Sequence, residues 1–466
     1  MADSKIHLET RVNGEPQASV RIRSRRRLIL GAMLAFLAAP AIGVAQQFDV
    51  KTYQLTNGMK ILLLEDHTIP NIALYFFHRV GSRNERTGLT GLSHFFEHMM
   101  FNGAKKYGPK MFDRAMEDQG GANNAYTSED LTVYQDWFPS SALPLIFDLE
   151  ADRTRDLSFD PKMVESERGV VANERRLSVE NNNERLLSEQ VVASAFMAHP
   201  YQWPVLGWMV DIERWRIEDL VQYFKTYYAP NNCEMVIVGD FQTESVIRMA
   251  RQYLEPIPAQ APPLPVTTAE PVQLGERRIQ VNKFAQLPIL QVTYHSPAAA
   301  DPDFIPLDVL EYILLRGQSS RLYQRLVDKE QVANSVRGGQ SPHLDPFLFE
   351  ITVQPRSGVA VERVEKILYE ELGKVQTNLV TEQELQKAKN TAIADFYRSM
   401  KTINGKANVL GTYDVVFGDY HKLFSAVDLI NQVSREEVER VAKKYFGPRN
   451  RTVGILVPDK TAEPKE

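Results

Sequence analysis

The chain has 466 residues, of which 43% are hydrophobic and 24% charged, and its formal net charge is −5. This length exceeds what one ordinary hydrophobic core organises, so two or more domains are expected. The mild acidity, with no long basic run in the body of the chain, makes nucleic acid an unsuitable partner. The only cysteine, Cys233, excludes an intramolecular disulfide and a thiolate zinc site.

The N-terminus has the pattern of an export signal. A basic segment, Arg21–Arg27, precedes the uncharged apolar stretch Leu28–Ala39, and Gly43–Ala45 has the small residues of a signal-peptidase site. We expect residues 1–45 to be removed and the protein to be periplasmic or otherwise exported. Ser24–Ile29 resembles a twin-arginine signal, with a general secretory signal as the alternative. An uncleaved anchor is disfavoured by the proline and small residues of the apolar stretch, so no stable membrane span is expected.

The first half of the chain alternates strand and helix patterns. Strand-like runs cover 60–65, 72–79, 122–127 and 132–138, and helical runs cover 92–101, 110–118 and 142–155. A further helix is predicted to begin at Asp160-Pro161, an N-cap followed by proline, and to run to about Glu180. Because strands come in adjacent pairs with helices between them, the pattern predicts an α+β fold with largely antiparallel sheets.

The helical run 92–101 contains the sequence His94-Phe95-Phe96-Glu97-His98. Positions i and i+4 share one helix face, so His94 and His98 can bind one metal ion, and Glu97 lies beside its open position. Two neutral imidazoles suit Zn²⁺, and H-x-x-E-H is the inverted zincin signature. The plainer interpretation is a pair of helix histidines without metal. Apolar neighbours indicate a buried helix, where polar side chains require a partner that a metal would supply.

The helix after Pro161 supplies candidates for a third metal ligand. Glu167 and Glu174 are seven residues apart and share a face, so one could bind metal while the other orients a ligand. Spacing alone does not choose between them. Glu165 and Glu180 are interpreted as residues of a solvated helix face.

A proline-rich segment divides the chain, and the two parts look related. Residues 255–272 contain six prolines and are predicted to be an extended linker. It separates a first domain that contains the H-x-x-E-H motif, 46–254, from a second domain, 273–466. Pro70 and Pro288 each precede a strand-like run, and Pro230 and Pro448 each follow a helix; both pairs are 218 residues apart. Agreement at both ends predicts a duplicated domain, with a metal motif only in the first copy.

The motifs together resemble the pitrilysin family of zinc peptidases, M16-type inverted zincins. The resemblance rests on G-L-S-H-F-F-E-H-M-M-F-N-G (91–103), G-G-A-N-N-A-Y-T (120–127), E-R-G-V-V-A-N-E (167–174), H-P-Y (199–201) and Y-Y-A-P-N-N (227–232). It covers residues 48 to about 460 and implies two homologous α+β domains that form half of a clamshell. The family spacing implies His94, His98 and Glu174 as ligands of one Zn²⁺ per chain, with Glu167 as the supporting acid.

The resemblance also implies an activity. Zinc would polarise the scissile carbonyl, and Glu97 would act as general base on the attacking water. The substrate, a peptide or unfolded polypeptide in a closed chamber, would add as a strand beside Asn124 and Ala125. Turn chemistry after Gly120-Gly121 is the alternative for Asn124. The alternative functions are a non-catalytic pitrilysin-like scaffold or core subunit and an acyl or phosphoryl hydrolase with the same metal chemistry.

One departure from the family pattern bears on assembly. Many members carry an Arg and a Tyr in the second domain that bind substrate near zinc, in a run resembling L-R-x-K-x-x-L-x-Y-S. Here Val327 and Asn334 stand at those two positions. The chain therefore resembles the zinc-bearing subunit of a bacterial two-subunit member, as in the division of labour of the mitochondrial processing peptidase. We expect a heterodimer with a homologous subunit that supplies the Arg–Tyr pair; a homodimer that uses Arg321 or Arg325 is the alternative.

Overall fold

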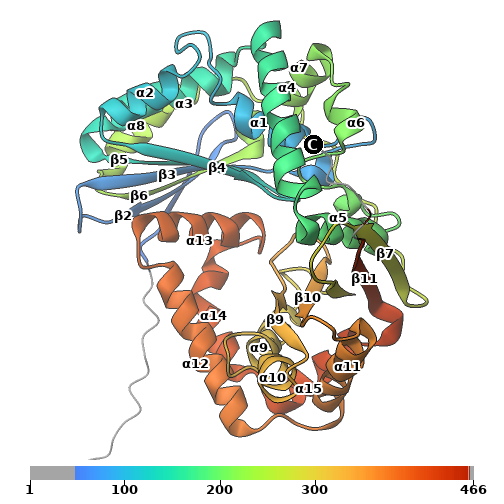
Figure 1. Ribbon diagram of the computed structural model, residues 1–466. Helices are drawn as coiled ribbons and strands as arrows, with labels where there is room; N and C mark the ends of the chain where they lie inside the picture. The colour runs from blue at the N-terminus through green and yellow to red at the C-terminus, as the bar shows by residue number, and fades with distance from the viewer. Residues whose placement is uncertain (1–47, 460, 462–466) are drawn as a thin grey trace, which may run out of the picture. The chain divides into compact units, whose positions relative to one another are not determined.

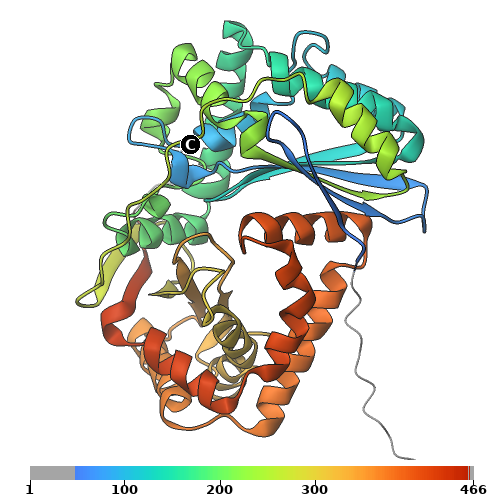
Figure 2. The same cartoon turned by 180° about the vertical axis from the view of Figure 1, so that it is seen from behind.

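The computed structural model describes residues 48–459 and 461, so the expected export signal at residues 1–45 lies outside the described part of the chain. The described residues belong to one compact unit. Two mixed β-sheets with helices packed on them form an α+β fold, as expected (Figures 1 and 2). Among the described residues, we find no helix with the length and apolar character that a membrane crossing requires.

The first half contains a six-stranded sheet in the order β1-β2-β6-β3-β5-β4. All neighbouring strands are antiparallel except the parallel pair β2 and β6. The strands are β1 Lys51–Gln54, β2 Lys60–Glu65, β3 Asn71–His78, β4 Ala122–Thr127, β5 Thr132–Pro139 and β6 Cys233–Gly239. The central strand β3 reads as a continuous apolar run because both of its faces are buried.

The second half repeats this arrangement with five strands in the order β7-β11-β8-β10-β9. Again one pair, β7 and β11, is parallel. The strands are β7 Arg277–Lys283, β8 Ile289–His295, β9 Ala333–Gly339, β10 Leu348–Pro355 and β11 Arg451–Pro458. The first residues of β3 and β8, and those of β6 and β11, are both 218 positions apart. This spacing and the equivalent strand order confirm the duplication predicted from the prolines.

The helices fall into the same two groups. Those of the first half are α1 Leu92–Met99, α2 Met111–Asp118, α3 Leu143–Asp156, α4 Pro161–Arg175, α5 Asn183–Ala195, α6 Met209–Ile212, α7 Ile217–Tyr227 and α8 Thr243–Tyr253. Those of the second half are α9 Phe304–Leu314, α10 Arg321–Tyr323, α11 Val361–Thr377, α12 Glu382–Ser399, α13 Ile403–Val415, α14 Ala426–Gln432 and α15 Arg435–Tyr445. Residues 258–274 between the halves contain neither helix nor strand.

Each half also places one helix on the sheet of the other half. Helix α13 packs on β3 and β6, where Ala407 and Leu410 join the core around Phe77 (Figure 1). Helix α5 packs on β7, β8 and β11, where Leu187 and Val191 lie in one hydrophobic cluster with strand residues. An offset of 218 carries α5 onto α13, so the exchanged helices are equivalent members of the repeat. Neither sheet is covered on both faces by its own half alone.

Candidate metal centre

Helix α1 is held rigidly by its apolar residues. Phe95 and Phe96 are fully buried, and the Phe96 ring stacks on Tyr223 with centroids 5.6 Å apart. At the N-terminus of the helix, Glu85 accepts hydrogen bonds from the backbone N–H groups of Gly91 (2.6 Å) and Ser93 (2.7 Å). This carboxylate satisfies two donors that the first helical turn leaves unpaired. The helix can therefore present its polar residues from a fixed backbone.

Two helices bring together three side chains that could hold a metal ion. His94 and His98 come from α1, and Glu174 comes from the last turn of α4. Oε2 of Glu174 lies 3.2 Å from Nε2 of His98 and 3.6 Å from Nε2 of His94. One ligand atom from each of the three residues lies within 4.8 Å of the others. The structure thus brings together the three residues that the family resemblance implies as ligands.

The spacing of these atoms fits a zinc ion. Zinc bonds of about 2.0–2.1 Å in a tetrahedron place two ligand atoms about 3.4 Å apart. The two distances from Glu174 to the imidazole nitrogens lie on either side of that value. Two imidazoles and one carboxylate also match the donor set of zinc hydrolases that keep a fourth position for water. The residues present therefore fit the implied metal.

Glu167 lies behind the ligands. Its Oε1 is 2.8 Å from Nδ1 of His98, and its Oε2 accepts a hydrogen bond of 2.6 Å from Asn102. Because Nδ1 of His98 bonds this carboxylate, Nε2 of the same ring faces the ligand group. Glu167 thus contacts only the far nitrogen of the His98 ring, whereas Glu174 lies beside the Nε2 atoms of both histidines.

The contacts within the site shift the pKa values of its ionisable side chains. Burial lowers the pKa of His98, but hydrogen bonds with Glu167 and Glu174 outweigh burial and raise that pKa to about 9. The rings of His94 and then His98 hold the pKa of the Glu174 carboxyl well below its usual range. For Glu167, burial raises the pKa, but the bonds from His98 and Asn102 give a net lowering. The carboxylates are therefore ionised and available to a cation.

Glu97 is one of only two half-buried residues on an otherwise buried helix, the other being His98. Its Oε2 accepts a hydrogen bond of 2.6 Å from Oγ1 of Thr127, the last residue of β4. The carboxylate is thus oriented from the neighbouring strand. Sequence reasoning assigned no contact to the Thr127 hydroxyl or the Asn102 amide, although both residues lie inside the motif segments. The only available signal was that each side chain can donate a hydrogen bond.

Strand β4 is the terminal strand of its sheet and lies next to α1. Asn124 pairs with Gln135 and Ala125 with Tyr134 on β5, so both are ladder residues and not turn residues. The side chain of Asn124 is exposed. The turn interpretation of Asn124 is thereby excluded.

The second half carries Val327 and Asn334 at the two positions where the family pattern has Arg and Tyr. Val327 is buried in the core of its half, and Asn334 lies exposed on β9, where its Nδ2 donates to the carbonyl of Pro355 at 3.4 Å. Arg321 is held by Glu384, with Nε 2.8 Å from Oε1. Arg325 is held by Glu330 at 2.9 Å. Both arginines offered as alternative substrate-binding groups are therefore engaged in ion pairs.

The solvated reading of the remaining helix carboxylates agrees with their exposure. The Glu165 side chain is 75% exposed and pairs with Arg168 on its own helix. Glu180 lies 3.7 Å from Nε of Arg175.

The duplicated α+β fold and the H-x-x-E-H helix with a downstream glutamate define the inverted zincin class. Comparison with known proteins agrees. The model of the insulinase family, peptidase family M16, matches residues 60–207, and the model described as the peptidase M16 inactive domain matches residues 214–392. The chain belongs to the M16 peptidase family.

Individual relatives are described as proteases. The chain is 30% identical over 410 residues to the zinc protease PqqE of Helicobacter pylori, covering 87% of this chain and 92% of that protein. The crystal structure of a protease from Helicobacter pylori superposes with a TM-score of 0.85 at 28% identity, covering 88% of this chain and all of that one. The periplasmic protease PqqL from Escherichia coli shares the fold, with a TM-score of 0.72 at 18% identity over 89% of this chain and 48% of that chain.

Proposed function

We propose that the protein is a zinc-dependent endopeptidase that cleaves peptides or unfolded polypeptides, with one Zn²⁺ held by His94, His98 and Glu174. The observation that carries the proposal is the gathering of these three ligands beside Glu97, a carboxylate that no ion pair neutralises in the described residues. Membership of the M16 family and the likeness to a zinc protease support it.

The chemistry follows from the arrangement of the side chains. Zinc, when bound, would polarise the scissile carbonyl and lower the pKa of water at the open position. Glu97 takes the proton of the attacking water and delivers it to the leaving amine. The open edge of β4 at Asn124 and Ala125 offers backbone groups to an extended substrate, which gives affinity with little demand on sequence.

A Glu97→Gln variant tests the proposal, because it keeps size and removes basicity. Peptidase activity on an unfolded polypeptide should fall by about 10² or more. Zinc content should stay at one per chain. A variant that retains full activity would refute the assignment, and a variant that loses its zinc would make Glu97 a ligand.

The scaffold alternative makes a different prediction. A non-catalytic core subunit has no need of metal ligands, and this chain keeps all three with a positioned Glu97. Zinc analysis of the purified protein together with the Glu97→Gln comparison separates the two functions. The same assay with ester and phosphoester substrates covers the acyl and phosphoryl hydrolase alternatives.

We further propose the organisation that accompanies this activity. Residues 1–45 are an export signal, 46–254 the peptidase domain, 255–272 a linker, and 273–466 the homologous domain without metal. The name of PqqL as a periplasmic protease supports an exported location. The unit is one half of a clamshell whose other half, a homologous subunit with an Arg–Tyr pair, closes the chamber around the substrate.

A further inference from the structure

The orientation of Glu97 depends on a residue outside its own helix. Oγ1 of Thr127 donates to Oε2 of Glu97 at 2.6 Å, a short bond of the kind that charged acceptors form. Thr127 ends β4, and the turn 128–131 follows immediately before β5 begins at Thr132. The position of the Thr127 hydroxyl therefore depends both on the pairing of Thr127 with Thr132 and on how firmly this turn is held.

The turn is fixed by first-half residues. The backbone N–H of Arg83 donates to the carbonyl of Glu129 at 3.0 Å. Asp130, only 3% exposed, accepts from Nη1 of Arg83 at 3.1 Å and from the hydroxyl of Tyr201 at 2.7 Å. A buried carboxylate with several donors allows little movement, since each lost bond leaves a charge unsatisfied.

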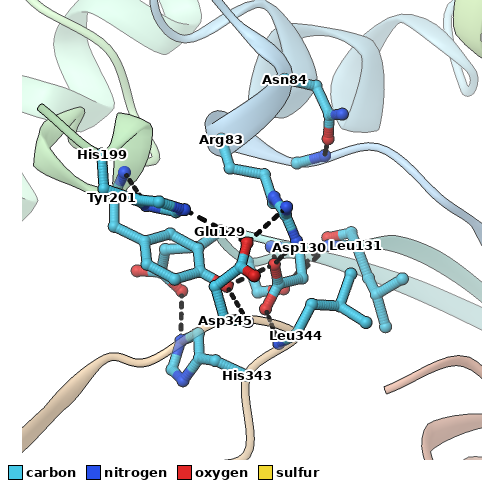
Figure 3. Close-up of polar contacts among 12 residues, drawn as sticks. Arg83, Asn84, Glu129, Asp130, Leu131, His199, Tyr201, His343, Leu344 and Asp345 are labelled. Atoms are coloured by element: carbon cyan, nitrogen blue, oxygen red, sulfur yellow. Dashed lines mark hydrogen bonds and ion pairs between the residues drawn. The ribbon is translucent and has the colours of Figure 1, made fainter. Parts of the chain in front are cut away.

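The second half completes this arrangement through the loop between β9 and β10 (Figure 3). The backbone N–H of Leu344 donates to Oδ2 of Asp130 at 3.0 Å, and Nε2 of His343 lies 3.2 Å from Oε2 of Glu129. Oδ2 of Asp345 lies 2.5 Å from Nη2 of Arg83 and 3.1 Å from Nε2 of His199. We call Arg83, Glu129, Asp130, Tyr201, His343 and Asp345 the interdomain cluster.

We propose that Thr127 is a positioning residue for Glu97 and that the metal-free half holds Thr127 in place through the interdomain cluster. By this route the second half influences the reaction of the first half through the turn 128–131 and Thr127, and not through a contact with metal or substrate. The chain of contacts runs from the β9–β10 loop to the turn 128–131, from the turn to Thr127, and from Thr127 to the general base. The inference rests on the proposed peptidase function.

Removing the hydroxyl tests the first link. Thr127→Val, which keeps the shape of the side chain, should lower kcat about 10-fold or more, the effect of one hydrogen bond to a charged group. KM and zinc content should stay within about twofold of wild type, and Thr127→Ser should restore most of kcat because it keeps the hydroxyl. Thr391→Val is the matched control, since it removes a hydroxyl that bonds only the Lys387 carbonyl of its own helix.

The outcomes separate this inference from the proposed function. Unchanged kcat in Thr127→Val, with Glu97→Gln inactive, overturns the positioning role and leaves the peptidase intact. A serine variant as slow as the valine variant also overturns it. Full activity in Glu97→Gln removes the peptidase mechanism on which both depend.

A double-variant cycle tests the second link. Glu129→Gln removes the charge opposite His343 and should lower kcat about threefold, within the range of coupled neighbours. The same change in the Thr127→Val background should lower kcat no further. An equal loss in both backgrounds would show that the cluster acts by another route. The control is Lys406→Gln, which removes a different ion pair between the halves, that of Lys406 with Asp66 at 2.5 Å just after β2. It leaves the bond from Tyr126 on β4 to Asn408 in place and should leave kcat unchanged.

Discussion

Nδ1 of His98 lies 2.8 Å from Oε1 of Glu167, and Nε2 of the same ring lies 3.2 Å from Oε2 of Glu174. Two carboxylates of α4 therefore contact the two nitrogens of one imidazole. The two glutamates on this helix, Glu167 and Glu174, are seven residues apart, and two helical turns carry them to the two sides of one imidazole. Spacing predicted that both glutamates would share a face, and the contacts give each a different role.

The first prediction compares these two carboxylates. Glu174→Gln should lower zinc occupancy and activity together because it removes a charged ligand. Glu167→Gln should weaken zinc affinity or rate by about 10–100-fold, the usual effect of losing a ligand-orienting carboxylate. Zinc titration with a competing chelator measures both affinities. An empty site in Glu167→Gln with a full site in Glu174→Gln would reverse the roles.

The second prediction concerns assembly. Because Val327 and Asn334 occupy the family's Arg and Tyr positions and Arg321 and Arg325 are held in ion pairs, a homodimer lacks free substrate-binding groups there. The zinc-loaded chain alone should cleave an unfolded polypeptide weakly, and a homologous subunit with the Arg–Tyr pair should restore activity. Substituting that partner's Arg or Tyr should abolish the gain. Full activity of the chain alone, unchanged by the partner, contradicts the heterodimer.

The third prediction is a pH dependence of stability at the interdomain cluster. Burial lowers the pKa of His343, but its hydrogen bond with Glu129 and the charges of Glu129 and Asp130 give a net increase. Tyr201 also faces the ring, and the nearby Glu350 has its pKa raised to about 7 by burial and by the charge of Glu129. Stabilisation from a raised histidine pKa is full below its unfolded value, about 6.5, and is lost as pH rises through the folded value.

Thermal unfolding of wild type and Glu129→Gln at two pH values measures this effect. The difference in Tm should be largest at pH 6, below the ordinary histidine pKa, and should shrink toward pH 9 as the pH rises through the raised folded pKa of His343. Ionised Glu350 at the higher pH adds repulsion with Glu129 in the wild type, which reduces the difference further. A Tm difference that grows from pH 6 to pH 9 would contradict the charge assignment.

The fourth prediction tests the packing of α13 on the first sheet. A Cβ added at Gly411 would overlap the ring of Phe77 on β3, so Gly411→Ala should lower the free energy of unfolding by about 1–3 kcal/mol. Gly373 on α11 has no heavy atom within 4 Å of an added Cβ, and Gly373→Ala should raise stability by about 0.5–1 kcal/mol. Denaturant unfolding measures the free energy of unfolding of both variants. Equal stability of the two variants would show that α13 does not pack tightly on β3 in solution.

Much of the local structure could be predicted from sequence. The strands at 60–65 and 122–127 have the expected bounds, and the helix from Pro161 begins as expected, with the Asp160 side chain accepting from the N–H groups of Lys162 and Met163. These features depend on periodicity and capping over a few residues, which a sequence displays directly. The metal motif is equally local, since His94 and His98 share a helix face by spacing alone.

Contacts between distant segments could not be predicted in this way. Leu410 and Phe77 are apolar in sequence, but periodicity shows that a side chain is buried and not against which partner. The bond from Thr127 to Glu97 depends on β4 lying beside α1, and the pairing of Asp130 with the Leu344 N–H joins residues 214 positions apart. Such contacts follow only from the complete topology.

The exchange of α5 and α13 between the halves has a consequence for biosynthesis. The inner face of the first sheet stays exposed to solvent until residues 403–415 have left the ribosome, although its own strands end at Gly239. Folding of the N-terminal half ahead of the rest, the usual order during synthesis, is therefore incomplete here, and the apolar surface around β3 needs protection during translation. The three proposed zinc ligands all precede residue 175, so the segment that carries them is synthesised long before the helix that completes the first half. A chain truncated before α13 should accordingly aggregate although it contains the whole H-x-x-E-H motif.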